Sequence, residues 1–207
     1  MTQLAQMETV VPGLYASPPE ALPFGSRLEI RSFLLERDAG NLLVYSTANA
    51  AGDVWRQYLN HWHEAAFAPE GLHAPVFVHA ADRDETEKER PVRASFSRRH
   101  MLDDDFEAIP TPGHTPGATA YLWDNAEHRF LFTGDTIMLR GTEWTTAVLG
   151  SSDRGAYLES LALMRDLDFD VLVPWVATAG GPFHAATDAA GTRRRINALI
   201  DEIWSGS

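Results

Sequence analysis

Cysteine is absent from this chain of 207 residues, so disulfide bonds and thiolate metal ligands are excluded. The sequence also has no uninterrupted apolar run long enough to span a bilayer. Its N-terminus lacks the basic region and the apolar core of a secretory signal. These absences favour a cytoplasmic protein that does not enter a membrane, although the cysteine count leaves the redox compartment undetermined.

Positive charge is scarce as well. The chain has 17 Lys and Arg against 29 Asp and Glu, for a formal net charge of −12. Proteins that bind nucleic acids normally present a basic stripe to the phosphates, and the arginines here are scattered in short groups. We therefore expect a small-molecule substrate and no nucleic-acid partner. The sequence leaves the oligomeric state open.

The composition is otherwise that of an ordinary soluble globular protein, with 44% hydrophobic and 22% charged residues. A chain of this length is large enough to bury a proper core. We found no internal repeat, low-complexity tract or interdomain linker. The sequence therefore predicts a single domain over residues 1–207.

The most specific stretch of the sequence covers residues 111–136. His114 lies between two Pro-Gly pairs. Proline fixes φ and glycine permits a positive φ, so the imidazole is presented from a tight loop. Residues 118–123 and 129–133 are predicted to form a hairpin, and Asp135 follows the end of its second strand. A histidine and a carboxylate at such positions are typical of a metal site.

Two further histidines, His61 and His63, follow a predicted strand over residues 56–60. In a continued strand they would point to the same side and could share one cation. Together with His114 they would offer three nitrogens and leave a position open for water, as in catalytic zinc sites. Other interpretations do not involve a metal. His61 and His63 could lie at an exposed strand end, and His114 could be a loop histidine hydrogen-bonded to the backbone.

These motifs resemble the metallo-β-lactamase superfamily. The resemblance covers most of the chain and is carried by H-x-H at residues 61–63, T-P-G-H-T-P-G at 111–117 and T-G-D-T at 133–136. It implies a four-layer αββα sandwich of the α/β (α+β) class, with two mixed sheets flanked by helices and the site at one edge. It also implies that His61, His63 and His114 bind a first metal, and that Asp135 occupies the position of the carboxylate that bridges two metals.

The sequence departs from the family's pattern at the second metal. The family motif H-x-H-x-D-H has Ala65 and Ala66 at its last two positions, and Trp175 follows the late strand that ends in proline, where a further histidine is expected. His184 is the one downstream histidine that could replace it. Pro182 and Phe183 precede it and favour a position of this loop on the surface. The resemblance therefore implies one divalent transition metal per chain, with zinc favoured and iron or manganese left open.

The remaining pattern predicts the scaffold. Strands are expected over 10–16, 28–36 and 42–45, a solvated charged helix over 82–90, and capped amphipathic helices that begin after Asp153 and Asp188. Residues 137–150 lack periodicity, and in the resembling family such loops line the pocket, which makes Arg140 and Trp144 candidate substrate contacts. Glu64 would face away from the histidines in a regular strand, whereas a bend could bring it round as a proton carrier.

The resemblance implies a metal-dependent hydrolase that acts on an ester, thioester or amide, with Asp135 orienting the water or carrying its proton. One metal lacks the two-metal clamp on attacking and leaving oxygens, which disfavours phosphodiester substrates. The alternative is a catalytically inactive binding or regulatory module, which Ala65 and Ala66 favour. A third hypothesis keeps the metal site but uses iron and oxygen chemistry.

Overall fold

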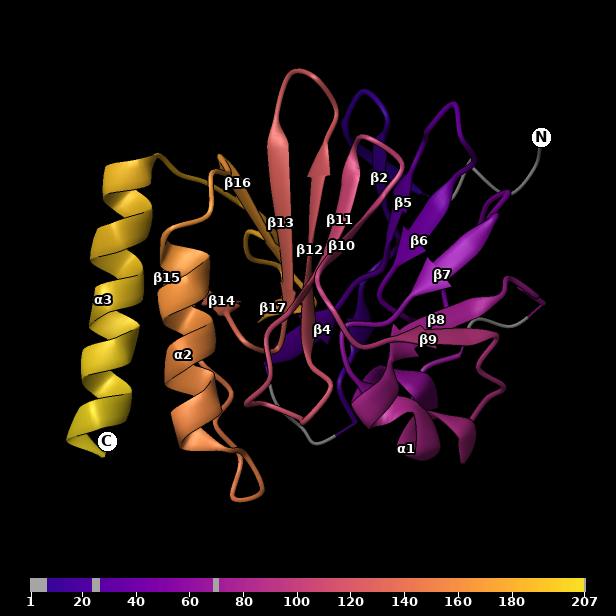
Figure 1. The fold of residues 1–207 in the computed structure, drawn as a ribbon. Coiled ribbons are helices and arrows are strands. Elements are labelled where there is room, and N and C mark those ends of the chain that lie inside the picture. The colour runs from indigo at the N-terminus through magenta and orange to yellow at the C-terminus, as the bar shows by residue number, and fades with distance from the viewer. Residues whose placement is uncertain (1–6, 24–26, 69–70, 207) are drawn as a thin grey trace.

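The computed structural model describes residues 7–23, 27–68 and 71–206. Two mixed sheets pack face to face, and a smaller third sheet extends them (Figure 1). The seven-stranded sheet contains, in spatial order, β1 (Glu8–Val11), β2 (Leu14–Ala16), β5 (Phe33–Leu35), β6 (Leu42–Val44), β7 (Arg56–Tyr58), β8 (Val76–His79) and β9 (Ala94–Phe96). The six-stranded sheet contains β10 (His100–Leu102), β11 (Phe106–Pro110), β12 (Thr119–Asp124), β13 (Arg129–Gly134), β16 (Val171–Pro174) and β18 (Ala185–Ala186).

The third sheet has five short strands, which are β15 (Glu143–Thr145), β14 (Met138–Arg140), β17 (Val176–Thr178), β4 (Leu28–Ile30) and β3 (Glu20–Ala21). Each large sheet mixes directions: β6 to β9 run parallel and β13 pairs in parallel with β16, whereas the other neighbours are antiparallel. The predicted sandwich of two mixed sheets is confirmed.

Two long helices cover the outer side of the six-stranded sheet, and shorter helices lie below β8 and β9 of the seven-stranded sheet. Figure 1 shows α2 (Arg154–Arg165) and α3 (Ala189–Ser205) side by side against the six-stranded sheet. On the side of the seven-stranded sheet lie α1 (Arg83–Glu87) and the short 3₁₀ helices η2 (Trp62–Ala66) and η3 (Ala80–Asp82). Within the described residues no helix is long and apolar enough to cross a membrane.

The two long helices begin where the sequence predicted. The carboxylate of Asp153 accepts a hydrogen bond from the Ala156 N–H at 3.0 Å, and that of Asp188 accepts one from the Gly191 N–H at 2.6 Å. These N-caps satisfy backbone donors that the first turn of a helix leaves unpaired. The apolar stripes of both helices then pack on the six-stranded sheet and close the second core of the protein.

The main core lies between the two large sheets and is rich in aromatic side chains. Phe33, Tyr45 and Phe132 are fully buried there, with ring centroids 5.8 to 6.0 Å apart. The Tyr45 hydroxyl donates to the Val173 carbonyl at 2.7 Å and accepts from the Gly134 N–H at 2.8 Å. These bonds fix the end of β13, from which Asp135 extends.

Two predicted strands are divided in the structure. Residues 10–16 form parts of the β1–β2 hairpin, which turns at Gly13 with φ of +84°. Residues 28–36 are shared between β4 and β5, which belong to different sheets. The chain changes sheet at Ser32, which is buried, with its N–H bonded to the Ser17 hydroxyl and its own hydroxyl to that of Thr47.

The expectation that Trp144 contacts substrate is wrong. Residues 138–145 form the small hairpin of β14 and β15 instead of an irregular loop. The Trp144 ring is buried in the second core, where it stacks on Phe169 at 6.5 Å, and the Arg195 guanidinium lies 5.3 Å from its centre. Arg140 is exposed beside the turn of this hairpin, where it pairs with Glu143.

A buried arginine joins the two large sheets at their upper end. Arg37 Nε donates to Asp105 Oδ2 at 2.8 Å, and its Nη2 pairs with Asp103 at 2.9 Å. Burial alone would raise the pKa of the Asp105 carboxyl, but the hydrogen bonds and charge of Arg37 outweigh it and hold that pKa below its usual value. Such a carboxylate stabilises the fold above its unfolded-state pKa, and this stabilisation is lost as the pH falls below it.

We therefore expect Asp105→Asn to lower the unfolding temperature near neutral pH, and to reduce its dependence on pH below about pH 4. The control is Asp104→Asn, because Asp104 is exposed. Thermal unfolding followed by circular dichroism between about pH 3 and pH 7 measures both effects. If Asp105→Asn lost stability with falling pH as steeply as the wild type does, the pairing of Asp105 with Arg37 would not be a source of the acid sensitivity.

Candidate metal centre

His61 and His63 meet at the site, but by a different route from the predicted one. Strand β7 ends at Tyr58, and His61 is the N-terminal cap of η2, with an extended backbone, while His63 lies within that helix. The prediction that strand alternation aligns the two side chains is therefore wrong. The 3₁₀ turn brings them together instead, with their ring centroids 5.0 Å apart.

His114 comes from the loop between β11 and β12, as the Pro-Gly pairs predicted. Gly113 has φ of +140°, and a Cβ placed on it would lie 2.5 Å from the Tyr157 Cα, so only glycine allows the loop to pack on α2. The Ser160 hydroxyl donates to the Pro112 carbonyl at 2.7 Å and secures this packing. His114 itself is 2% exposed, and its Nδ1 lies 2.7 Å from the Ala147 carbonyl.

The three imidazoles form a compact group of nitrogen donors. Nδ1 of His63 lies 3.1 Å from Nε2 of His114, and one donor atom from each of the three histidines lies within 4.8 Å of the others. Nε2 of His61 is buried and has no hydrogen-bond partner. Because a buried nitrogen without a partner is costly, this arrangement suits a cation that accepts all three lone pairs.

Asp135 completes the group from the end of β13. Its Oδ2 lies 3.5 Å from Nε2 of both His61 and His114, and its Oδ1 is buried without a partner. Burial would raise the pKa of the Asp135 carboxyl, but the neighbouring histidines, His61 first, hold it below its usual value. The residues present therefore fit a divalent metal with three histidine ligands and an adjacent carboxylate.

Glu64 orients His61 and is fully buried. The bend considered from the sequence is present, and one oxygen of Glu64 accepts the N–H groups of Asn60 and His61 at 3.0 and 3.3 Å and lies 3.1 Å from His61 Nδ1. This contact holds a proton on Nδ1, so Nε2 is the nitrogen that faces the cluster. Burial raises the pKa of Glu64 to about 7 against the opposing effect of His61.

The electrostatics of the group favour one imidazolium at most. Burial alone would lower the pKa of His61, but Asp135 and Glu64 raise it to about 10. Burial and the positive charge of His61 lower the pKa of His63 to about 3 and also lower the pKa of His114. In the metal-free protein His61 therefore carries the positive charge, while His63 and His114 are neutral at physiological pH. A metal bound at Nε2 of His61 would displace the proton from that nitrogen.

Glu64→Gln should weaken metal binding by about 10- to 100-fold, as is typical when an outer-shell partner of a ligating histidine is changed. Glutamine keeps the shape of the side chain, so the circular dichroism spectrum should stay that of the wild type. Competition with a chromophoric chelator measures the affinity. Glu89→Gln on the exposed surface is the control, and equal affinity of both variants would contradict an orienting role for Glu64.

Asp82 is a structural member of the site that the sequence did not reveal. It belongs to the charged run predicted to be solvated, but it is 1% exposed. Its carboxylate accepts from the Trp62 N–H at 3.1 Å, the Thr115 hydroxyl at 2.6 Å and the Gly117 N–H at 2.7 Å. Asp82 thus ties the His61–His63 turn to the His114 loop. Its position at the start of the run, at the end of the short η3 helix that follows β8, was the one available signal.

The positions where the sequence lacks expected ligands hold apolar side chains. Trp175 is buried, its ring centroid lies 5.5 Å from that of His61, and its Nε1 donates to the Ser46 carbonyl at 3.0 Å. Ala65 and Ala66 present only methyl groups. His184 is exposed against Phe183, with ring centroids 5.1 Å apart, and does not belong to the histidine group.

The sandwich of two mixed sheets thus carries, at one edge, a histidine cluster that could hold a metal ion. The sequence profile of the metallo-beta-lactamase superfamily matches residues 54–174, and the chain belongs to that superfamily. Most of its members are metal-dependent hydrolases that bind divalent metals. A search of curated proteins gave no match.

Solved structures of this superfamily share the fold at low sequence identity. A metallo-beta-lactamase from Pontibacter korlensis is 12% identical, with 94% of this chain and 98% of that chain covered and a TM-score of 0.66. A metallo-beta-lactamase family protein from Thermus thermophilus is 16% identical, with 95% and 81% covered and a TM-score of 0.63. A metallo-beta-lactamase from Cronobacter sakazakii is 14% identical, with 97% and 93% covered and a TM-score of 0.64.

Proposed function

We propose that this protein is a mononuclear metal-dependent hydrolase that acts on a small neutral ester, thioester or amide. The proposal is carried by two buried atoms that have no hydrogen-bond partner, Nε2 of His61 and Oδ1 of Asp135. They lie beside the imidazoles of His63 and His114, which could bind the same metal ion. His61, His63 and His114 would hold the metal, and zinc suits this ligand set best, while iron or manganese could also occupy it.

A divalent cation held there supplies Lewis acidity toward a substrate carbonyl and increases the acidity of water. Asp135 lies beside two of the ligands, and its free Oδ1 can accept a proton of the attacking water and fix its orientation. The Ala147 carbonyl contacts Nδ1 of His114, and the Glu64 carboxylate contacts Nδ1 of His61, on the side of each ring that faces away from the metal position. These contacts leave the geometry fixed before a substrate binds.

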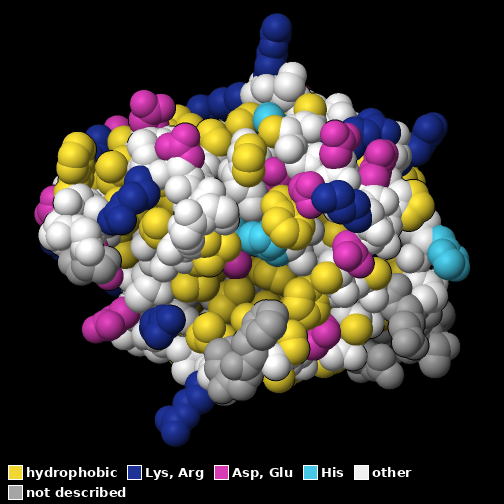
Figure 2. Space-filling model, turned by 90° about the horizontal axis from the view of Figure 1, so that it is seen from below, with side chains coloured by type: hydrophobic (Ala, Val, Ile, Leu, Met, Phe, Trp, Pro, Cys, Tyr) yellow, Lys and Arg dark blue, Asp and Glu magenta, His cyan; other side chains and the backbone are white. Residues whose placement is uncertain are grey.

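The substrate class follows from the surroundings of the site. Ala65, Ala66 and Trp175 cannot bind a second metal. The proposed site therefore lacks the pair of metals that favours phosphodiester cleavage. The loop between β11 and β12, which carries His114, lies at the lower end of the sandwich in Figure 1, and Figure 2, which views the molecule from below, shows a hollow with hydrophobic side chains on its floor and a histidine at its edge. Half-buried Trp62 and Phe67 supply apolar surface close to His63 and Trp175. An uncharged acyl group suits such walls.

The test is hydrolysis by zinc-loaded protein of nitrophenyl esters, a thioester and an anilide, with bis-nitrophenyl phosphate as the comparison. We expect turnover of at least one carbonyl substrate, and a loss of about 100-fold or more in Asp135→Asn, which removes the proton acceptor while zinc stays bound. Turnover of the phosphodiester alone, or full activity of Asp135→Asn, would contradict the proposal.

A second candidate is a metal-containing binding or regulatory module without catalysis. It is favoured by Ala65, Ala66 and Trp175, because three positions of the family's second site have become apolar at once. Zinc-loaded protein that hydrolyses none of the carbonyl substrates, while a product such as a free carboxylate binds at the zinc, would favour this candidate over the hydrolase.

A further inference from the structure

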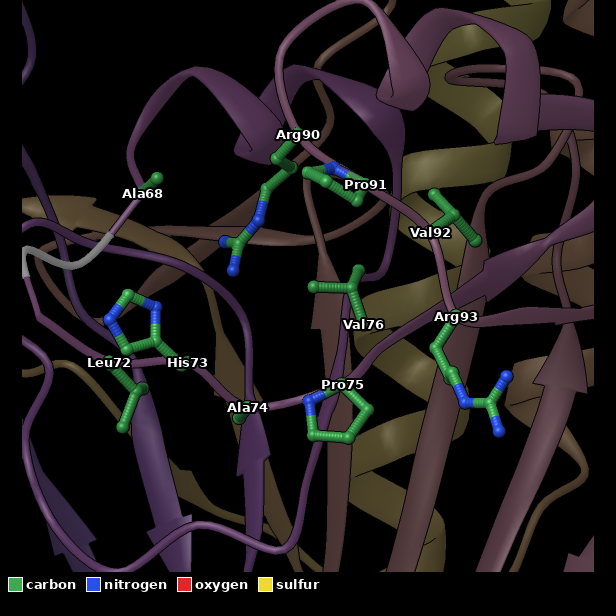
Figure 3. Close-up of a pocket in the computed structure, with 10 residues that line it drawn as sticks. All are labelled: Ala68, Leu72, His73, Ala74, Pro75, Val76, Arg90, Pro91, Val92 and Arg93. Atoms are coloured by element: carbon green, nitrogen blue, oxygen red, sulfur yellow. The ribbon is translucent and has the colours of Figure 1, made fainter.

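Two pockets adjoin at the starts of strands β8 and β9. The first lies on the outer side of the seven-stranded sheet, with Val76, and the second lies on the side of Phe77, which packs against the main core. The first has a volume of about 580 Å³ and is shown in Figure 3. The second has a volume of about 450 Å³ and shares Pro75 and Arg93 with the first. None of the three histidines of the metal centre lines either pocket, so this groove is a separate feature of the molecule.

The charge of the groove is opposite to that of the protein. The chain has a net charge of −12, yet the charged side chains that line the two pockets are Arg56, Arg90 and Arg93. No aspartate or glutamate belongs to the described lining of either pocket. A groove of this kind concentrates a positive potential on an otherwise acidic surface and attracts small anions.

Arg90 is the residue that distinguishes this groove. It is half-buried, and its two terminal nitrogens donate to neutral oxygens, Ser46 Oγ at 3.1 Å and Gln57 Oε1 at 2.9 Å. Among the described residues, no carboxylate forms an ion pair with Arg90. Burial lowers the pKa of Arg90 while Glu64 opposes this effect, and an arginine stays charged regardless.

Two arginines with little exposed side chain have carboxylate partners, unlike Arg90. Arg37, with 2% of its side chain exposed, pairs with Asp103 and Asp105. Arg31, with 12% exposed, pairs with Glu8 and Glu29. A charge withdrawn from water without a partner costs free energy, so the folded protein holds at Arg90 a cation whose partner is still to be bound.

The position of the Arg90 side chain is fixed in advance. Gln57 is fully buried, and its Nε2 donates to the Tyr45 carbonyl at 2.8 Å, which leaves Oε1 directed at Arg90. The Ser46 hydroxyl donates to the Phe67 carbonyl at 2.9 Å and accepts from Arg90. Figure 3 shows the Arg90 guanidinium extended into the pocket, between His73 and Val76, while the Arg93 guanidinium points away from it. A guanidinium has five N–H donors, so these two bonds do not exhaust those of Arg90. An anion bound there would meet a preorganised partner.

The walls of the groove are apolar and flat. Leu72, Pro75 and Val92 line the first pocket, and in the second Arg56 stacks 3.8 Å above the Trp55 ring and 5.0 Å from that of Phe77. We propose that the first pocket binds a small organic anion, with a carboxylate or phosphate head on Arg90 and an apolar body against Leu72, Pro75 and Val92. The proposal is independent of the hydrolase activity.

Isothermal titration with phenyl phosphate, benzoate and neutral benzyl alcohol tests this site. We expect saturable binding of one or both anions, and weakening by about tenfold or more in Arg90→Gln, because charge-assisted hydrogen bonds are lost. The preferred anion identifies the head group. Arg98→Gln, an exposed arginine outside both pockets, should bind as the wild type does. Arg93→Gln, also exposed, should weaken binding by about threefold and does not put folding at risk.

The same titration on His63→Ala separates this groove from the metal centre, because an anion could also bind a metal. The proposal predicts unchanged binding in that variant. Binding that is lost in His63→Ala but kept in Arg90→Gln and Arg93→Gln would overturn it. So would a failure of both anions to saturate the wild type below about 10 mM, or benzyl alcohol binding as tightly as they do.

Discussion

Replacing His63 with alanine should lower the affinity for zinc by more than about 100-fold, beyond the effect usual for outer-shell changes. His63 is one of three imidazoles whose donors lie within 4.8 Å of one another, so its loss leaves two nitrogens and a neighbouring carboxylate. His63 is half-buried and pairs with no carboxylate among the described residues, whereas His61 contacts the buried carboxylate of Glu64. The variant should therefore lose its metal while the metal-free protein keeps its fold.

The matched control for this experiment is His184→Ala. His184 is exposed and lies outside the histidine group, so its removal should leave both the zinc content and the unfolding temperature unchanged. Zinc retained after dialysis against a chelator, measured for the two variants and the wild type, decides the matter. If His184→Ala loses zinc and His63→Ala keeps it, the ligand assignment is wrong.

Asp82→Ala should be the most destabilising single change near the site, at about 3–5 kcal/mol. The substitution removes the acceptor of three buried donors at once, from Trp62, Thr115 and Gly117. Each of these groups would be left unpaired in an interior where Asp82 is 1% exposed. Because the two histidine-bearing segments would no longer be tied together, zinc affinity should fall as well.

Urea unfolding of the metal-free protein measures this effect without a contribution from bound zinc. Asp84→Ala is the control, since Asp84 lies two residues away on the exposed side of α1 and its loss should cost less than about 0.5 kcal/mol. Equal midpoints for the two variants would show that the hydrogen bonds of Asp82 do not hold the site together.

The parts of the site that depend on local backbone chemistry could be predicted from the sequence. The Pro-Gly pairs around His114 predicted a tight loop, and the hairpin of β12 and β13 placed Asp135 at a strand end. The caps Asp153 and Asp188 predicted the starts of α2 and α3. Each of these features is decided within a few residues, where turn and capping preferences are strong.

The parts that depend on distant partners could not be predicted in this way. Asp82 is separated by 33 and 35 residues from two of its donors, so nothing local distinguishes it from the solvated acids that follow. Ser32 is bonded to Ser17 and Thr47, which is why the strand predicted over 28–36 divides there. The burial of Trp144 likewise depends on Phe169, to which it is not adjacent in the chain.

The binding of one metal by His61, His63 and His114 is the central claim, and the metal content of the purified protein tests it most directly. Protein prepared without added metal, and again after zinc loading and desalting, is analysed by inductively coupled plasma mass spectrometry together with its concentration. Because Ala65, Ala66 and Trp175 cannot bind a second ion, the account predicts about one transition metal per chain after loading. Two tightly bound metals per chain, or none after loading, would contradict it.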